Sequence, residues 1–109
     1  SQERRRLADV KANRVKLDKY VDETIAIESA QIDVYDPARL EVYLDEVTRI
    51  KLRALDELTD EALRDDRVFS IFLMQCANLI SKIQLKIITY SSSGGDSYSS
   101  TQTTDDEGA

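Results

Sequence analysis

The sequence of 109 residues contains no histidine, no tryptophan and no glycine before Gly94. Without histidine, neither a Ser-His-Asp nor a Cys-His nucleophile arrangement can form, and Glu-x-x-His metal motifs are excluded as well. Without early glycines, no glycine-rich loop can bring backbone N–H groups onto a phosphate. We therefore expect a protein that is not an enzyme, holds no cofactor and binds no small molecule.

The acidic residues also lack the spacing of a known metal site. Acidic pairs recur along the chain, but none lies in the Asp-x-Asp-x-Asp-Gly loop that binds calcium. These pairs are Asp45/Glu46, Asp56/Glu57, Asp60/Glu61 and Asp65/Asp66. We expect them to form solvated helix faces and no metal site.

The chain has one cysteine, Cys76, and one methionine, Met74. A single cysteine cannot form an internal disulfide, so an intracellular setting is compatible. Because the first residue is not methionine, we expect the chain to be part of a longer or processed protein. The apolar run at residues 68–88 is interrupted by seven polar side chains, so we expect it to be a core helix and not a membrane span.

The chain is acidic overall but basic over its first 20 residues. With 21 acidic and 15 basic residues, the net charge is −6, which argues against nucleic-acid binding. Residues 1–20 carry seven basic and three acidic side chains, a net charge of +4. The basic residues Arg4, Arg5, Arg6 and Lys11 are interaction candidates, since such a segment suits the cytoplasmic surface of a membrane. An ordinary solvated helix is the alternative.

Helix-breaking residues are few, which favours long helices. Residues 3–34 place apolar side chains at helical spacing. These are Leu7, Val10, Leu17, Val21, Ile25 and Ile32. Asp36 followed by Pro37, the only proline, predicts the start of a second helix, because Asp caps free N–H groups and Pro suits the first helical position.

The second helix is expected over residues 37–64, with a break near 64–66. Its inward face is expected to hold Leu40, Leu44, Val47, Ile50, Ala54 and Leu58. Two sites in this region can start a new helix: Thr59, which is followed by two acids, and the pair Asp65/Asp66.

The third helix is expected over residues 67–90 and at the centre of the bundle, because it is apolar on almost every side. Its core face is Phe69, Phe72, Leu73, Cys76, Ile80, Ile83 and Ile87, with Ile71, Leu79 and Ile88 largely buried beside it. Cys76 is interpreted as a buried apolar residue and not as a redox thiol. Gln75 and Asn78 either form an interhelical pair that sets register or point to water.

From residue 91 the composition changes to serine, threonine, glycine and acids, which is typical of a disordered tail over 91–109. The predicted fold is therefore all-α over residues 1–90: a three-helix antiparallel bundle or long helical hairpin, completed within the chain or by a second copy.

Three stretches resemble a known family. They are LDKYVDETI, DPARLEVYLDEVTRIKLRALDELTDEAL and FSIFLMQCANLISKIQLKI. Their order is similar to the cytoplasmic C-terminal helical extension of TAXI-type solute-binding subunits of TRAP transporters. The residues that carry the likeness are Leu40, Leu44, Asp45, Glu46, Leu55, Phe72, Leu79, Ile80 and Ile83. The resemblance implies a helical domain at the inner face of a membrane.

The sequence thus predicts a non-enzymatic helical module for interaction or oligomerisation, cytoplasmic and near a membrane. A second hypothesis is a soluble adaptor or signalling domain that binds a partner helix in a groove. In either case the expected partner is a second copy of the chain or another helix.

Overall fold

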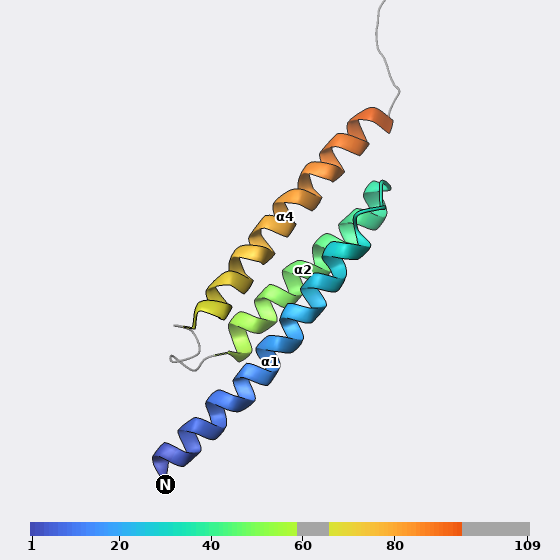
Figure 1. Ribbon diagram of the computed structural model, residues 1–109. Coiled ribbons are helices and arrows are strands. Elements are labelled where there is room, and N and C mark those ends of the chain that lie inside the picture. The colour runs from blue at the N-terminus through green and yellow to red at the C-terminus, as the bar shows by residue number, and fades with distance from the viewer. Residues whose placement is uncertain (59–65, 95–109) are drawn as a thin grey trace, which may run out of the picture.

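The computed structural model describes residues 1–58 and 66–94, with side chains through Ser91. It is an all-α bundle of α1 (Gln2–Ala30), α2 (Pro37–Glu57) and α4 (Arg67–Gly94). Figure 1 shows α1 and α2 as an antiparallel hairpin, with α4 again antiparallel to α2. The molecule is elongated, measuring 78 × 20 × 18 Å. The predicted fold class is therefore confirmed.

The junction between α1 and α2 follows the sequence signals. The Gln31 N–H donates to the Ile27 carbonyl at 3.0 Å, which closes the last turn of α1. The side chain of Asp36 then accepts from the Ala38 N–H at 3.1 Å, and Pro37 occupies the first helical position. Asp36 satisfies an N–H group that has no partner within the helix, which explains why α2 begins here.

The helix ends differ from the expected ones. α2 ends at Glu57, well before residue 64, and the Leu58 N–H donates to the Ala54 carbonyl at 2.9 Å. The restart expected at Thr59 lies outside the described residues. α4 begins after Asp66, whose side chain accepts from the Val68 N–H at 2.7 Å. It continues through Gly94, so the first four residues of the expected tail are helical, and the rest lies outside the described residues.

The core lies between α2 and α4, and α1 packs against both. Of the predicted core residues, Leu40, Val47, Phe72, Cys76 and Ile83 are buried. Leu44 and Ile80 are partly buried and pack against this core. Fully burying a leucine, valine, isoleucine or phenylalanine side chain contributes roughly 1.5–3 kcal/mol.

The buried face of α1 is only in part the predicted one. Of the predicted residues, Leu17 is buried and Val21 packs against the core, but Leu7, Ile25 and Ile32 are half exposed or more. The other buried positions of the helix are Tyr20, Thr24 and Ile27. The buried series continues past the helix end through Gln31 and Val34. The prediction missed Tyr20, Thr24 and Gln31 because it followed hydrophobicity alone, and these three side chains carry polar groups.

The first part of α1 extends beyond the bundle. Residues 1–9 are all exposed, and Leu17 is the first buried residue of the helix. Figure 1 shows this segment continuing past the adjacent ends of α2 and α4. The first part of the basic segment, residues 1–9, therefore projects from the bundle, and we call it the arm.

Candidate interaction surfaces

α4 carries a second apolar face on the side away from the core. Met74, Leu85 and Ile88 are 57%, 64% and 63% exposed, and Ile71 is also exposed. The core residues Phe72, Cys76 and Ile83 lie on the opposite side of the same helix. The expectation that Ile71 and Ile88 are largely buried was wrong, because α1 and α2 cover only one side of α4.

The exposed residues of this face follow a regular spacing. Six positions, separated alternately by three and four residues, form what we call the outer seam. They are Ile71, Met74, Asn78, Ser81, Leu85 and Ile88, and all are exposed. This is the spacing by which one helix packs against another in a coiled coil. The outer seam therefore has the pattern of a helix-binding surface.

Gln75 and Asn78, whose burial the sequence left open, are both exposed. Asn78 lies in the middle of the outer seam. Gln75 lies beside it, toward the edge where Lys82 Nζ approaches Glu28 Oε2 of α1 at 3.5 Å. The described fold thus leaves both amide side chains accessible to a second molecule.

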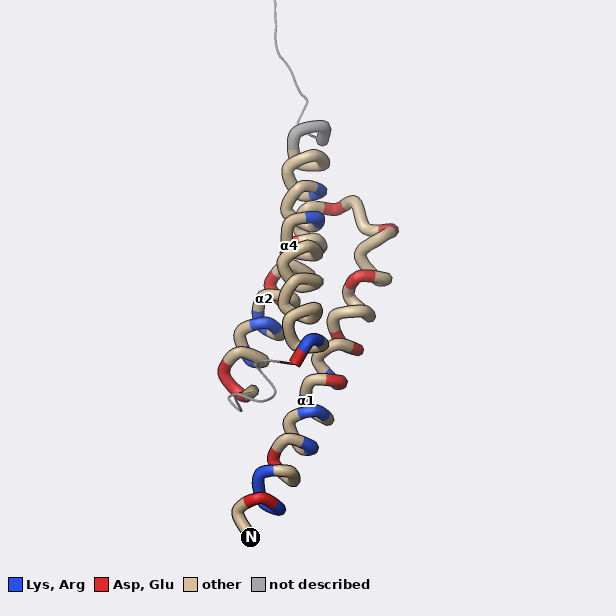
Figure 2. The backbone as a smooth tube through the Cα atoms, turned by 60° about the vertical axis from the view of Figure 1, so that its left-hand side comes forward, with Lys and Arg blue, Asp and Glu red and all other residues tan. Residues whose placement is uncertain are grey.

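The basic candidates are split between the arm and the bundle. Arg4, Arg5 and Lys11 are exposed, and Figure 2 shows the basic positions distributed along the projecting part of α1. Arg6 pairs with Glu3 at 3.0 Å, and this hydrogen bond, together with the Arg6 charge, lowers the pKa of Glu3. Residues 1–9 hold three arginines and two acids, so the arm has a net charge of +1, and the other three positive charges of residues 1–20 lie in the part of α1 that follows it.

Arg14 has a different role from the arm residues. Its Nη2 donates to Asp66 Oδ2 at 2.7 Å, which joins α1 to the start of α4. The sequence could not indicate this contact, because the two residues are 52 positions apart.

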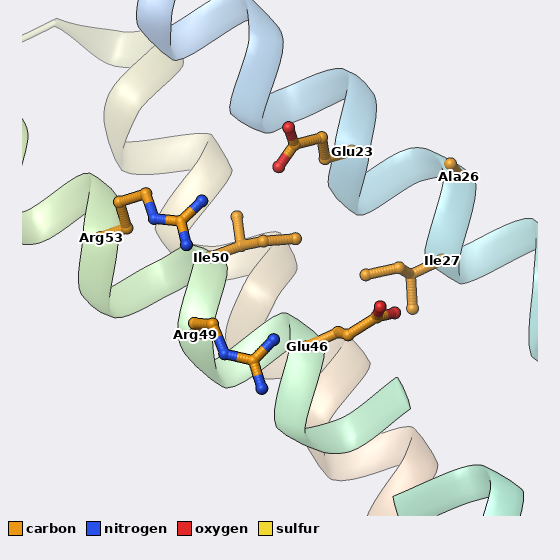
Figure 3. Close-up of a pocket in the computed structure, with 7 residues that line it drawn as sticks. All are labelled: Glu23, Ala26, Ile27, Glu46, Arg49, Ile50 and Arg53. Carbon is orange, nitrogen blue, oxygen red and sulfur yellow. The ribbon is translucent and has the colours of Figure 1, made fainter. Parts of the chain in front are cut away.

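A groove of about 300 Å³ lies between α1 and α2 (Figure 3). Ile27 and Ile50 approach each other across it, as the close-up shows. Its other lining residues are Glu23, Ala26, Glu46, Arg49 and Arg53. Two acids and two bases balance, so the groove favours no ligand of a single charge. Sequence reasoning missed it because its walls depend on the rotation of α1.

A second groove of about 290 Å³ lies between α2 and α4. It is lined by Glu41, Leu44, Gln84, Ile87 and Ile88. Since Ile88 also belongs to the outer seam, this groove adjoins the seam at its C-terminal end.

Cys76 is fully buried. Burial raises the pKa of its thiol, while a hydrogen bond with Thr24 and the charge of Lys51 act in the opposite direction. A raised pKa keeps the thiol protonated, and the protonated form is a poor nucleophile and metal ligand. The position is therefore that of a core side chain, as predicted from the sequence.

Within residues 1–58 and 66–94, no group of three or more acidic or cysteine side chains is placed to hold a metal ion.

α4 is long and apolar enough to cross a membrane by length and composition alone, although part of that stretch is buried in the bundle. In comparisons with known proteins, the chain matches no family model, no curated protein and no solved structure.

Proposed function

We propose that this chain is a non-enzymatic helical module whose function is self-association through the outer seam of α4. The observation that carries the proposal is the exposure of Met74, Leu85 and Ile88 along one helix face. Large apolar side chains gathered on one exposed face commonly mark a protein or membrane contact. Covering it would contribute about 25 cal/mol per Å² of apolar area removed from water.

The spacing of the outer seam favours another helix as the covering element. Its alternating intervals of three and four residues repeat over Ile71 to Ile88, a length of about 26 Å at ~1.5 Å per residue. A helix laid along this line would contact every position of the seam. The α2–α4 groove that adjoins Ile88 extends this apolar surface.

Sedimentation velocity of the whole chain tests the proposal. At micromolar concentration the wild type is expected to sediment above its monomer mass of 12.4 kDa. A Met74→Lys/Leu85→Lys variant is expected to be monomeric, because each lysine would place a charge in the contact. Val42→Lys/Leu52→Lys is the matched control, since these α2 residues are both 59% exposed and outside the seam. A wild type that stays at 12.4 kDa would contradict the proposal.

We further propose that the module lies at the cytoplasmic face of a membrane, as part of a TAXI-type TRAP transporter subunit. Two observations support this location: the sequence resemblance and the exposed basic residues of the projecting arm. Positive segments next to a membrane are attracted to anionic lipids by about 1 kcal/mol per basic residue. Co-sedimentation with anionic vesicles tests the location.

A further inference from the structure

The outer seam has the same polarity pattern in both chain directions. It begins with two apolar residues, Ile71 and Met74, and ends with two, Leu85 and Ile88. Asn78 and Ser81 stand between them. Read from residue 88 to residue 71, the seam again has two apolar, two polar and two apolar positions with the same spacing. In an antiparallel pair of α4 helices, apolar positions would therefore face apolar ones and polar positions would face polar ones.

We infer that two copies of the chain pair through α4 in antiparallel orientation, about a two-fold axis between residues 79 and 80. This inference rests on the proposed function and adds its geometry. A two-fold contact is reciprocal, so that if residue i contacts residue j, residue j contacts residue i. The pairs are then Ile71 with Ile88, Met74 with Leu85, and Asn78 with Ser81 of the second copy.

Side-chain size and hydrogen bonding favour this orientation. Antiparallel pairing sets the larger Asn78 against the small Ser81, where the amide and the hydroxyl can hydrogen-bond across the axis. A parallel pair in register would set serine against serine and leave a gap at that layer, and such gaps lose packing energy.

Charge favours the same orientation. The N-terminal arm lies at the same end of the molecule as the start of α4, as Figures 1 and 2 both show. A parallel dimer would bring together two N-terminal segments that each carry a net charge of +4 over residues 1–20. An antiparallel dimer sends them to opposite ends.

Thiol cross-linking of two single-site variants, Met74→Cys and Leu85→Cys, distinguishes the orientations. Each is treated with a short bismaleimide alone and as an equal mixture, and wild type controls for the buried Cys76. The antiparallel dimer predicts a covalent dimer in the mixture and little in either variant alone, because identical positions lie about 16 Å apart along the axis at ~1.5 Å per residue. Ile71→Cys with Ile88→Cys provides a second pair if the first one weakens association.

Each other outcome overturns the inference in a recognisable way. Strong self-cross-linking of each variant alone would show a parallel pair. Dimers by sedimentation that cross-link in no combination would show that another face is used, while self-association itself would stand. A wild-type monomer would overturn the proposed function as well. A monomer that binds neutral-lipid vesicles, and loses this binding in Met74→Lys/Leu85→Lys, would identify lipid as what covers the seam.

Discussion

The residues that join α1 to the bundle include three side chains with polar groups, and each of these groups has a hydrogen-bond partner. The Tyr20 hydroxyl donates to Glu57, and Thr24 Oγ1 donates to the Tyr20 carbonyl at 2.9 Å. Gln31 Oε1 accepts from Lys86 Nζ at 3.0 Å. A buried polar group costs little only when it is paired. These contacts explain how α1 can bury a mixed face and leave Ile25 exposed.

Because of Tyr20, the free energy of unfolding should change with pH in the alkaline range. Burial and the hydrogen bond to Glu57 raise the pKa of Tyr20 to about 12, against about 10 for an unfolded tyrosine. Below about pH 10 the hydroxyl is protonated in both states, and its contribution is fully present. Between about pH 10 and 12 the unfolded state releases the proton first, so the free energy of unfolding falls as pH rises.

Urea unfolding at a series of alkaline pH values checks this dependence. Tyr20→Phe should lower the free energy of unfolding by about 0.5–1.5 kcal/mol near neutral pH, because the hydrogen bond is lost. It should also flatten the decline between about pH 10 and 12. Tyr35→Phe, at an exposed position, is the control and should keep the decline. The same decline in Tyr20→Phe as in wild type would rule out Tyr20 as its source.

At the scale of the helices, aspartates define two of the starts. Asp36 and Asp66 each accept a hydrogen bond from the N–H two residues ahead. Asp66 has a second function, because its other carboxylate oxygen accepts from Arg14 of α1. The start of α4 and the position of α1 are therefore linked through one side chain.

Substitutions at Asp66 should separate these two functions. Asp66→Ala removes both the cap and the ion pair, and should lower the free energy of unfolding by about 1–2 kcal/mol. Asp66→Asn keeps a capping oxygen and loses only the charge, so its cost should be smaller than about 1 kcal/mol. Chemical denaturation of both variants, alone and combined with Arg14→Gln, measures the coupling. Equal losses in Asp66→Asn and Asp66→Ala would show that the ion pair, and not the cap, dominates.

At the scale of the whole molecule, the elongated shape separates a packed bundle from a projecting charged arm. The arm, residues 1–9, buries no side chain, and α1 first enters the core at Leu17. Stability should therefore depend on the bundle, and any attraction to an anionic surface should depend in part on the arm.

Deletion of residues 1–9 tests this separation. The shortened chain should unfold within a few degrees of wild type, because the deleted side chains are exposed and contribute little burial. Its co-sedimentation with anionic vesicles should fall modestly, since the deletion removes three arginines and two acids and leaves the basic residues at 11–19 in place. Neutral vesicles control for non-electrostatic binding. Unchanged binding to anionic vesicles would contradict the membrane role of the arm, and a large fall in melting temperature would contradict its independence.

The sequence by itself determined the all-α class, the start of α2 at Pro37, and core positions such as Phe72 and Cys76. These follow from local causes: few helix breakers, capping chemistry, and a strong apolar face on each of the last two helices. Tertiary structure alone decided which face of α1 is buried and which apolar side of α4 stays exposed. Both depend on how many neighbours a helix has and where their hydrogen-bonding groups lie, and helical periodicity in one segment carries no information about either.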